Sequence, residues 1–334
     1  MERVRVKKIE IINFKGIEHL ELDFTYLDSD RILDNIVFYG INGSGKSTIL
    51  EAIDISLTMN TWSPSSDDCD SIEDYFIEKY SLGSEWIYNH KSEFQINLQI
   101  IENTNTIESV FKYSPLKGIS WSIKEGLLSK NFKENPSFLY LSAYRLFYPT
   151  KVEKAGDWHK IKKLERSKFY NESHSIGMQF SNDYSIVKQY LVNLVTDKKV
   201  GVIQDENLQV LEKIKKAFEI FFPNKIFLEQ LARSDMNQDY KFLIENEDGT
   251  VVDIDQLSSG EREVIAFFTY LSTKALNVSI LIIDEPELHL HDKWQSLIPY
   301  AIRKLFPNVQ LFMATHSEEI HQSFSESELF GLVK

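Results

Sequence analysis

The chain has 334 residues, 43% of them apolar, and a formal net charge of −13 at pH 7. This is enough apolar material for a full core in one large domain or two, and no run of about 18 apolar residues is present that could span a bilayer. The negative charge argues against general adhesion to nucleic acid, whose phosphates would be repelled.

The first forty residues have the alternating pattern of β-strands. Apolar and polar residues alternate over 5–14 and again over 20–24, with a turn at 14–17, which predicts an antiparallel pair leading into a strand at 36–39. The N-terminus lacks the hydrophobic region of a signal peptide.

A glycine-rich loop follows, because residues 40–47 read Gly-Ile-Asn-Gly-Ser-Gly-Lys-Ser and precede a helix-like run at 48–53. Strand, loop and helix in this order are the setting of a phosphate-binding loop. The glycines allow backbone N–H groups to surround an anion, and the helix N-terminus adds positive potential. Lys46 is expected to reach the β- and γ-phosphates of ATP, and the Ser47 hydroxyl to bind Mg²⁺. The predicted nucleotide-binding residues are Asn42, Gly43, Ser44, Gly45, Lys46, Ser47 and Thr48.

Residues 65–70 are polar and acidic, which predicts an exposed loop, with a metal site as the weaker alternative. This loop contains the single cysteine, Cys69. One cysteine excludes an internal disulfide framework and a zinc-binding thiolate cluster, and it fits a reducing cytoplasm. A cytoplasmic protein is therefore expected.

Strict alternation returns over 94–100 and, with 107–113, predicts further edge strands of a mixed sheet. Residues 138–143 are typical of a buried strand. From about 150 to 225 the alternation is lost, and helical spacing of apolar residues predicts helices at 183–195 and 207–222.

This helical segment is too short, and too poor in heptads, for a long coiled-coil arm. Within it, residues 151–168 contain seven Lys or Arg against three acids. Such a run is either a solvated face or a contact for nucleic acid or a partner.

A second helix start is predicted where Leu257-Ser258-Ser259-Gly260-Glu261-Arg262 precedes an apolar run at 264–271. Ser258 and Glu261 have capping-box spacing. An ordinary N-cap before a core helix explains this spacing equally well.

Two later strands end in residues suited to chemistry on a phosphate. Apolar residues 280–283 end in Asp284 and Glu285, as in a buried parallel strand that delivers carboxylates to a ligand. Asp284 is expected to hold Mg²⁺ with Ser47, and Glu285 to orient and deprotonate the attacking water. The strand at 309–315 ends at His316, which either contacts the γ-phosphate or is structural. The predicted catalytic residues are Glu285 and His316.

These motifs, in this order, resemble those of ABC-type ATPases, and within them the RecF/SMC/OLD-like branch. The resemblance is carried by residues 9–17, 257–262 and 284–291. It identifies 257–261 as the signature motif, with Ser258, Ser259 and Gly260 contributing to nucleotide binding, and His316 as the switch histidine.

The fold implied by the resemblance is α/β: an ABC-ATPase head with a mixed β-sheet, an antiparallel N-terminal β-subdomain and a helical insertion. We expect an N-terminal ATPase lobe at 1–150 with the Walker A motif. A mainly helical insertion is expected at 151–245. A C-terminal lobe with signature, Walker B and switch histidine is expected at 246–334.

The sequence departs from the family pattern at two places. Ser142-Ala143-Tyr144-Arg145 stands where transporter ATPases usually carry a glutamine, and Arg145 is a candidate for a phosphate-side role. His291, followed by Asp292, stands at the position of the D-loop aspartate.

The resemblance implies that the signature helix of one protomer faces the γ-phosphate held by another, so that ATP joins a head-to-tail homodimer or higher oligomer and hydrolysis releases it. Three functions are open: an ATPase of a bacterial antiphage defence system that controls a separate effector such as a nuclease; a RecF/SMC-like ATPase that clamps DNA in repair; and a transporter subunit. The missing glutamine and the extension at 287–291 disfavour the last. Only eighteen residues follow His316, too few for the nuclease domain of OLD-type proteins, so an effector is expected to be a separate protein.

Overall fold

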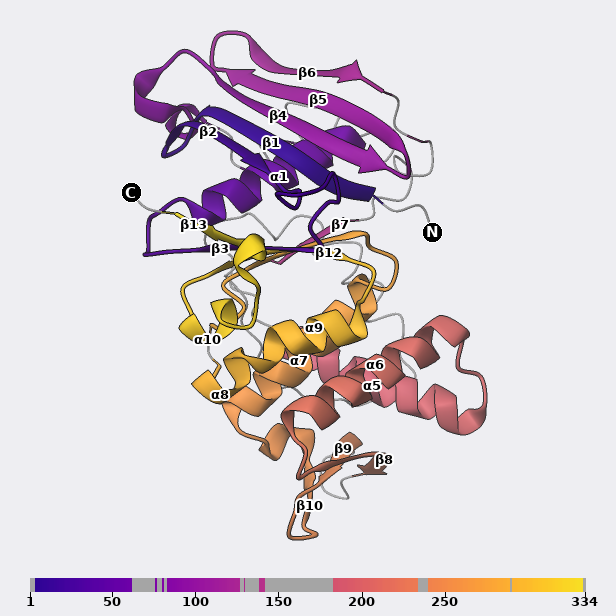
Figure 1. The fold of residues 1–334 in the computed structure, drawn as a ribbon. Helices are drawn as coiled ribbons and strands as arrows, with labels where there is room; N and C mark the ends of the chain where they lie inside the picture. Colours follow the sequence, from indigo (N-terminus) through magenta and orange to yellow (C-terminus); the bar gives the residue numbers. More distant parts are fainter. Residues whose placement is uncertain are drawn as a thin grey trace.

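The computed structural model describes residues 4–61, 76, 80, 83–126, 129, 138–141, 183–233, 240–288 and 290–332. These residues are stacked in layers (Figure 1). An antiparallel sheet lies at one end, a helix separates it from a parallel sheet, and the remaining long helices and a small sheet lie beyond the parallel sheet.

The antiparallel sheet has the strand order β2-β1-β4-β5-β6. Its strands are β1 (Val4–Phe14), β2 (Ile17–Asp23), β4 (Phe94–Glu102), β5 (Asn105–Ser114) and β6 (Gly118–Glu125). The predicted N-terminal pair is confirmed as β1 and β2. The strands β4 and β5 were expected at the edge of a mixed sheet but lie inside this antiparallel one, because β6 pairs with β5 and takes the edge.

The parallel sheet has the order β13-β3-β12-β11-β7. Its strands are β3 (Asn35–Tyr39), β7 (Phe138–Leu141), β11 (Ile280–Asp284), β12 (Gln310–Thr315) and β13 (Leu329–Gly331). Along β11, Ile280 and Ile282 pack on one face and Leu281 and Ile283 on the other. Burial on both faces explains why this strand is a continuous apolar run rather than an alternating one.

Helix α1 (Lys46–Thr61) fills the layer between the two sheets. Its apolar side chains are buried together with β1 and β4 on one side and with β11 and β12 on the other. On the opposite face of the parallel sheet lie α7 (Ser259–Lys274) and α9 (Leu297–Leu305). Short helices and turns complete this part: α8 (Asp292–Gln295), α10 (Glu318–His321), η1 (Ser84–Trp86), η2 (Tyr88–His90), η3 (Ile254–Gln256) and η4 (Glu326–Glu328).

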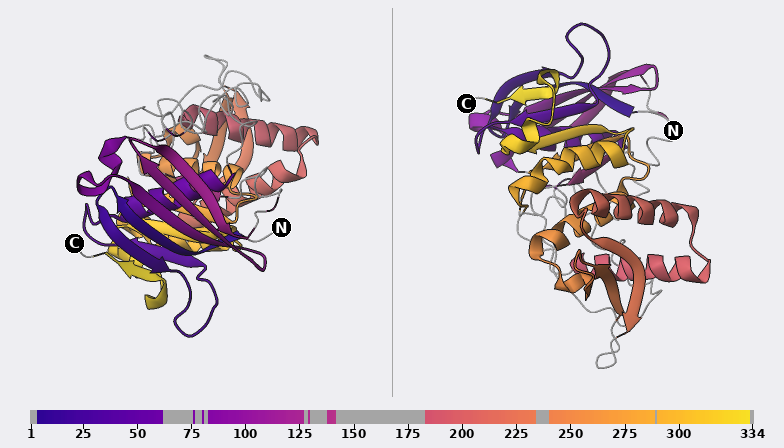
Figure 2. Two further views of the ribbon diagram at one scale, coloured as in Figure 1. Left: turned by 90° about the horizontal axis from the view of Figure 1, so that it is seen from above. Right: turned by 60° about the horizontal axis from the view of Figure 1, so that its bottom comes forward.

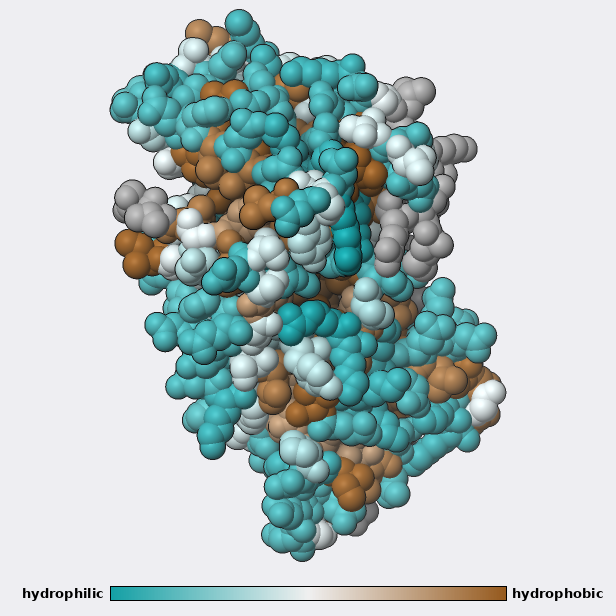
Figure 3. All heavy atoms as spheres, viewed as in Figure 1, coloured by the Kyte–Doolittle hydropathy of each residue, from teal (hydrophilic) through white to brown (hydrophobic). Residues whose placement is uncertain are grey.

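The described part of the expected insertion begins with the two predicted helices, which form as α5 (Asp183–Val200) and α6 (Asp205–Phe221). They are followed by a small antiparallel sheet that the sequence did not predict, of β8 (Ile226–Arg233), β9 (Tyr240–Glu245) and β10 (Val251–Asp253). Figures 1 and 2 show helices and sheet together, beyond the parallel sheet. Figure 3 shows a mostly hydrophilic face with scattered apolar residues. Among the described helices, none is long and apolar enough to cross a membrane.

Lys188 on α5 ties this region to the start of α7. Its side chain is fully buried and pairs with Asp253 at 3.0 Å and Asp255 at 2.6 Å. Burial alone would lower the pKa of Lys188, but the hydrogen bonds to Asp255 and Asp253 outweigh it and raise that pKa. Asp255 lies in η3, three residues before Ser258, and its carbonyl accepts from Arg262 at 3.1 Å. The ion pairs therefore fix the turn that leads into α7.

Replacing Lys188 with methionine is expected to lower the free energy of unfolding by about 2–4 kcal/mol, because two carboxylates lose their buried cation. Urea denaturation measures this change. Lys198→Met on the same helix is the matched control. Lys198 is 36% exposed, and its partner Glu229 retains Lys215, so we expect a loss below about 1 kcal/mol. Equal losses in the two variants would contradict the assigned role of Lys188.

Candidate functional site

The predicted phosphate loop connects the end of β3 at Tyr39 to the start of α1 at Lys46. Gly40 has φ of +149°, and a side chain there would place its Cβ 2.6 Å from the carbonyl oxygen of Leu332. Gly43 and Gly45 also have positive φ, +76° and +99°. Position 40 therefore needs glycine for space as well as for conformation.

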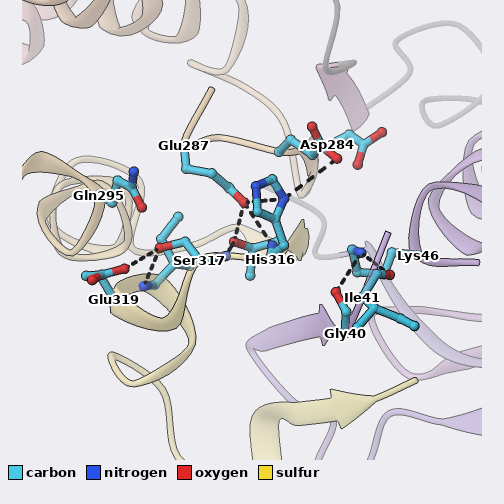
Figure 4. Close-up of polar contacts among 12 residues, drawn as sticks. Gly40, Ile41, Lys46, Asp284, Glu287, Gln295, His316, Ser317 and Glu319 are labelled. Carbon is cyan, nitrogen blue, oxygen red and sulfur yellow. Dashed lines mark hydrogen bonds and ion pairs between the residues drawn. The ribbon is translucent and has the colours of Figure 1, made fainter. Parts of the chain in front are cut away.

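Lys46 is buried within this loop. Its Nζ donates to the carbonyl oxygens of Gly40 at 2.9 Å and Ile41 at 3.1 Å, as Figure 4 shows. Ser44 Oγ is buried without a hydrogen-bond partner. Asn42 and Gly43 are exposed, and Thr48 is partly buried. A buried ammonium and an unsatisfied hydroxyl in one glycine loop suit an anionic ligand.

The acidic pair lies at the carboxyl end of the parallel sheet, beside the loop. Ser47 Oγ donates to Asp284 Oδ1 at 3.1 Å. Glu285 follows with φ of +46°, and its N–H donates to the carbonyl of Ala314 at 2.9 Å. A non-glycine residue in the left-handed region costs free energy and is often found at functional sites.

Hydroxyl and carboxylate oxygens are the ligands that Mg²⁺ prefers, so Ser47 and Asp284 fit this ion. Within the described ranges, no cluster of three or more His, Cys, Asp or Glu could hold a metal. Two protein oxygens are enough for Mg²⁺ when substrate phosphates and waters complete its shell.

His316 lies at the end of β12, at the same edge of the sheet (Figure 4). Its Nδ1 is 3.9 Å from Glu285 Oε1 and 3.3 Å from Glu287 Oε1. Glu287 is buried and also accepts from the Thr315 hydroxyl at 2.7 Å and the His316 backbone N–H at 2.9 Å. Glu287 was not predicted as a site residue, although it lies within the segment 284–291 that carries the family resemblance.

The predicted capping box is present at the start of α7. Ser258 is the exposed N-cap, and its N–H and hydroxyl donate to Glu261 Oε2 at 2.9 and 2.8 Å. Lys225 pairs with Glu261 at 2.9 Å. Burial would raise the pKa of Glu261, but the hydrogen bonds from Lys225 and Ser258 hold it below its usual value. Because Lys225 offsets this carboxylate, the helix keeps the positive potential of its N-terminus.

Gly260 is covered by Trp294 of α8. A Cβ at Gly260 would lie 2.9 Å from Trp294 Cζ3, and the indole packs edge-on against Phe222 with ring centroids 5.4 Å apart. The indole of Trp294 thus lies between the first turn of α7 and the end of α6.

The structure brings together one group of predicted residues and leaves another apart. Lys46, Ser47, Asp284, Glu285 and His316 gather at the carboxyl ends of the parallel strands. Within the described part of the chain, no hydrogen bond or ion pair joins residues 258–260 to the loop at 40–48. Instead α7 packs on the face of the parallel sheet opposite to α1.

Several predicted features lie outside the described residues: the acidic loop at 65–70, the segment 142–145 with Arg145, and the basic run at 151–168. His291 is described. It is the exposed N-cap of α8, and its Nδ1 accepts from the N–H of Lys293 at 3.3 Å.

Known proteins share both the sequence pattern and the fold. A family model described as "AAA domain, putative AbiEii toxin, Type IV TA system" matches residues 36–320. The chain is 24% identical to the Retron Ec83 probable ATPase of Escherichia coli, over 99% of this chain and 72% of that protein. It is 25% identical to the Septu protein PtuA of Bacillus mycoides (strain KBAB4), over 93% of this chain and 38% of that protein.

Among solved structures, an SMC head bound to the C-winged helix domain of ScpA is similar, with a TM-score of 0.54 and 14% identity. The match covers 98% of this chain and 93% of the SMC head chain. The predicted fold class, an ABC-ATPase head with an antiparallel β-subdomain, is confirmed.

Proposed function

This chain belongs to the AAA domain family of putative AbiEii toxins of type IV toxin–antitoxin systems and is an ATPase, and from that premise we propose that it is the nucleotide-driven switch of a bacterial antiphage defence system. Two copies would close head to tail on ATP and separate after hydrolysis. The closed form would control a separate effector protein, such as a nuclease. Similarity to retron and Septu proteins supports the defence role.

The observation that carries the head-to-tail arrangement is the placement of Ser258. It stands exposed at the N-terminus of α7, on the opposite face of the parallel sheet from the helix that follows the phosphate loop. A helix N-terminus suits a γ-phosphate, and the Ser258 hydroxyl would exchange its hydrogen bond to Glu261 for one to the phosphate. A phosphate bound by the loop of a second copy would supply that ligand.

The chemistry would take place at the carboxyl end of β11. The loop and Lys46 would hold the β- and γ-phosphates, and Glu285 would orient and deprotonate the attacking water. Ser47 and Asp284 would hold Mg²⁺, which neutralises developing charge on the phosphates when bound. His316 would contact the γ-phosphate from β12.

A mixing experiment tests the shared site. Lys46→Ala and Ser258→Arg are each expected to abolish hydrolysis. In a dimer with shared sites, each heterodimer has one pocket in which both halves are intact. In an equimolar mixture, up to about a quarter of all sites would then be intact. Turnover measured by phosphate release should recover accordingly.

The control mixes Lys46→Ala with Glu285→Gln, two substitutions that lie in the same half of the pocket. No heterodimer then has an intact site, so no recovery of turnover is expected. Failure of the first mixture to recover would show that Ser258 does not act across subunits. The defence role is tested separately by phage plating on cells that carry the gene cluster with wild-type chain or Lys46→Ala.

The DNA-clamping alternative gains no specific support. The likeness to the SMC head is at 14% identity and shows the fold alone. The basic run at 151–168 lies outside the described residues.

A further inference from the structure

We propose that Glu287 is a positioning residue for His316. Its buried carboxylate fixes the imidazole with Nδ1–H turned toward Glu287, which leaves Nε2 to face the nucleotide. This inference deepens the proposed function, because it rests on His316 being the residue that contacts the γ-phosphate.

The contacts of one oxygen carry the argument. Glu287 Oε1 accepts from the Thr315 hydroxyl at 2.7 Å and from the His316 N–H at 2.9 Å, and it lies 3.3 Å from His316 Nδ1. Two hydrogen bonds therefore fix the end of β12 to this carboxylate, and the same oxygen lies beside the imidazole ring (Figure 4). The Glu287 side chain is only 4% exposed, whereas that of His316 is 44% exposed.

The chemistry of the carboxylate determines the tautomer. An ionised carboxylate only accepts hydrogen bonds, so the imidazole nitrogen beside it must carry a hydrogen. Nε2 is then the nitrogen left for the nucleotide, and it would donate to the γ-phosphate once the ring takes up a second proton from solvent. This is the same device by which an outer carboxylate orients a histidine that binds a metal or acts as a base.

Glu285 cannot take this role as well. Its Oε1 lies 3.9 Å from Nδ1, beyond hydrogen-bond distance, and its side chain is 25% exposed. Glu287 is also left with Oε2 buried and without a hydrogen-bond partner. A contact with Thr315 alone would need only an uncharged acceptor, which costs less to bury than a carboxylate. The carboxylate at this position is therefore better explained by its contact with the imidazole. The two carboxylates would thus have different roles: Glu287 orients the imidazole ring, and Glu285 acts on the attacking water.

A double-mutant cycle in ATP turnover tests the coupling. Glu287→Gln and His316→Gln are each expected to lower kcat by about tenfold or more, and the double variant to be no slower than His316→Gln alone. Additive losses would overturn the proposal. Glu319→Gln, on the neighbouring helix α10, removes a carboxylate that contacts Ser317 at 3.1 Å. This control should leave kcat unchanged.

A second measurement does not depend on hydrolysis. Long-range ¹H–¹⁵N spectra of the nucleotide-free protein report which imidazole nitrogen carries the hydrogen, and His316→Gln assigns the signal. We expect the Nδ1–H form in the wild type, and the Nε2–H form would overturn the proposal even if Glu287→Gln failed to fold. If His316→Gln leaves kcat unchanged, His316 does not contact the γ-phosphate as proposed. The spectrum would still test whether Glu287 positions the ring.

Discussion

Replacing Glu285 with glutamine is expected to lower ATP turnover by about 10²–10⁴-fold while nucleotide binding is retained. Glutamine keeps the size and hydrogen-bonding capacity of the side chain but cannot accept the proton of the attacking water. With hydrolysis blocked, the ATP-bound assembly should accumulate. Phosphate release measures the turnover, and light scattering with and without ATP measures the mass.

The control for this variant is Glu318→Gln, which changes the same type of side chain at an exposed position of α10. Turnover near the wild-type rate in Glu285→Gln would place the general base elsewhere. An unchanged mass with ATP would show that the nucleotide does not join two copies, even if Glu285 is the base.

Lys46→Ala should weaken ATP binding by about 10²-fold or more. A buried ammonium that pairs with phosphate is worth several kcal/mol, and its loss leaves the phosphates facing carbonyl oxygens. Those oxygens belong to Gly40 and Ile41, the present acceptors of Lys46 Nζ. Isothermal titration calorimetry measures the affinity directly.

Lys91→Ala is the matched control, since Lys91 is 49% exposed and lies 3.9 Å from Glu18 near the antiparallel sheet. Its removal should leave the ATP affinity unchanged. Tight binding by Lys46→Ala would remove the assignment of residues 40–47 as the phosphate loop.

The parts of the fold that were predictable from the sequence are those with local signals. Strands β3, β11 and β12 are apolar on both faces because both faces are buried. The start of α7 was predicted because the side chains of Ser258 and Glu261 each accept a hydrogen bond from the other residue's backbone N–H within one turn. The loop at 40–47 was recognisable because its glycines and lysine have fixed spacing.

The parts that were missed depend on contacts between distant residues. Strand β8 reads Ile-Phe-Leu-Glu-Gln-Leu-Ala-Arg, several of them good helix formers, and it becomes a strand only by pairing with β9. Its register shifts near Glu229, which has φ of +51°. The role of Glu287 likewise could not be predicted, because its contacts with Thr315 and His316 form only when β12 lies beside it.

The contact of Trp294 with Gly260 has a consequence for timing. Only nine residues lie between Asp284 and Trp294, so the segment that follows the proposed magnesium ligand also supports that chain's first turn of α7. In the proposed head-to-tail dimer, that turn would serve the opposite pocket. Departure of product from one pocket would then loosen the first turn of α7 that faces the other, so the two pockets of the proposed dimer would turn over in alternation.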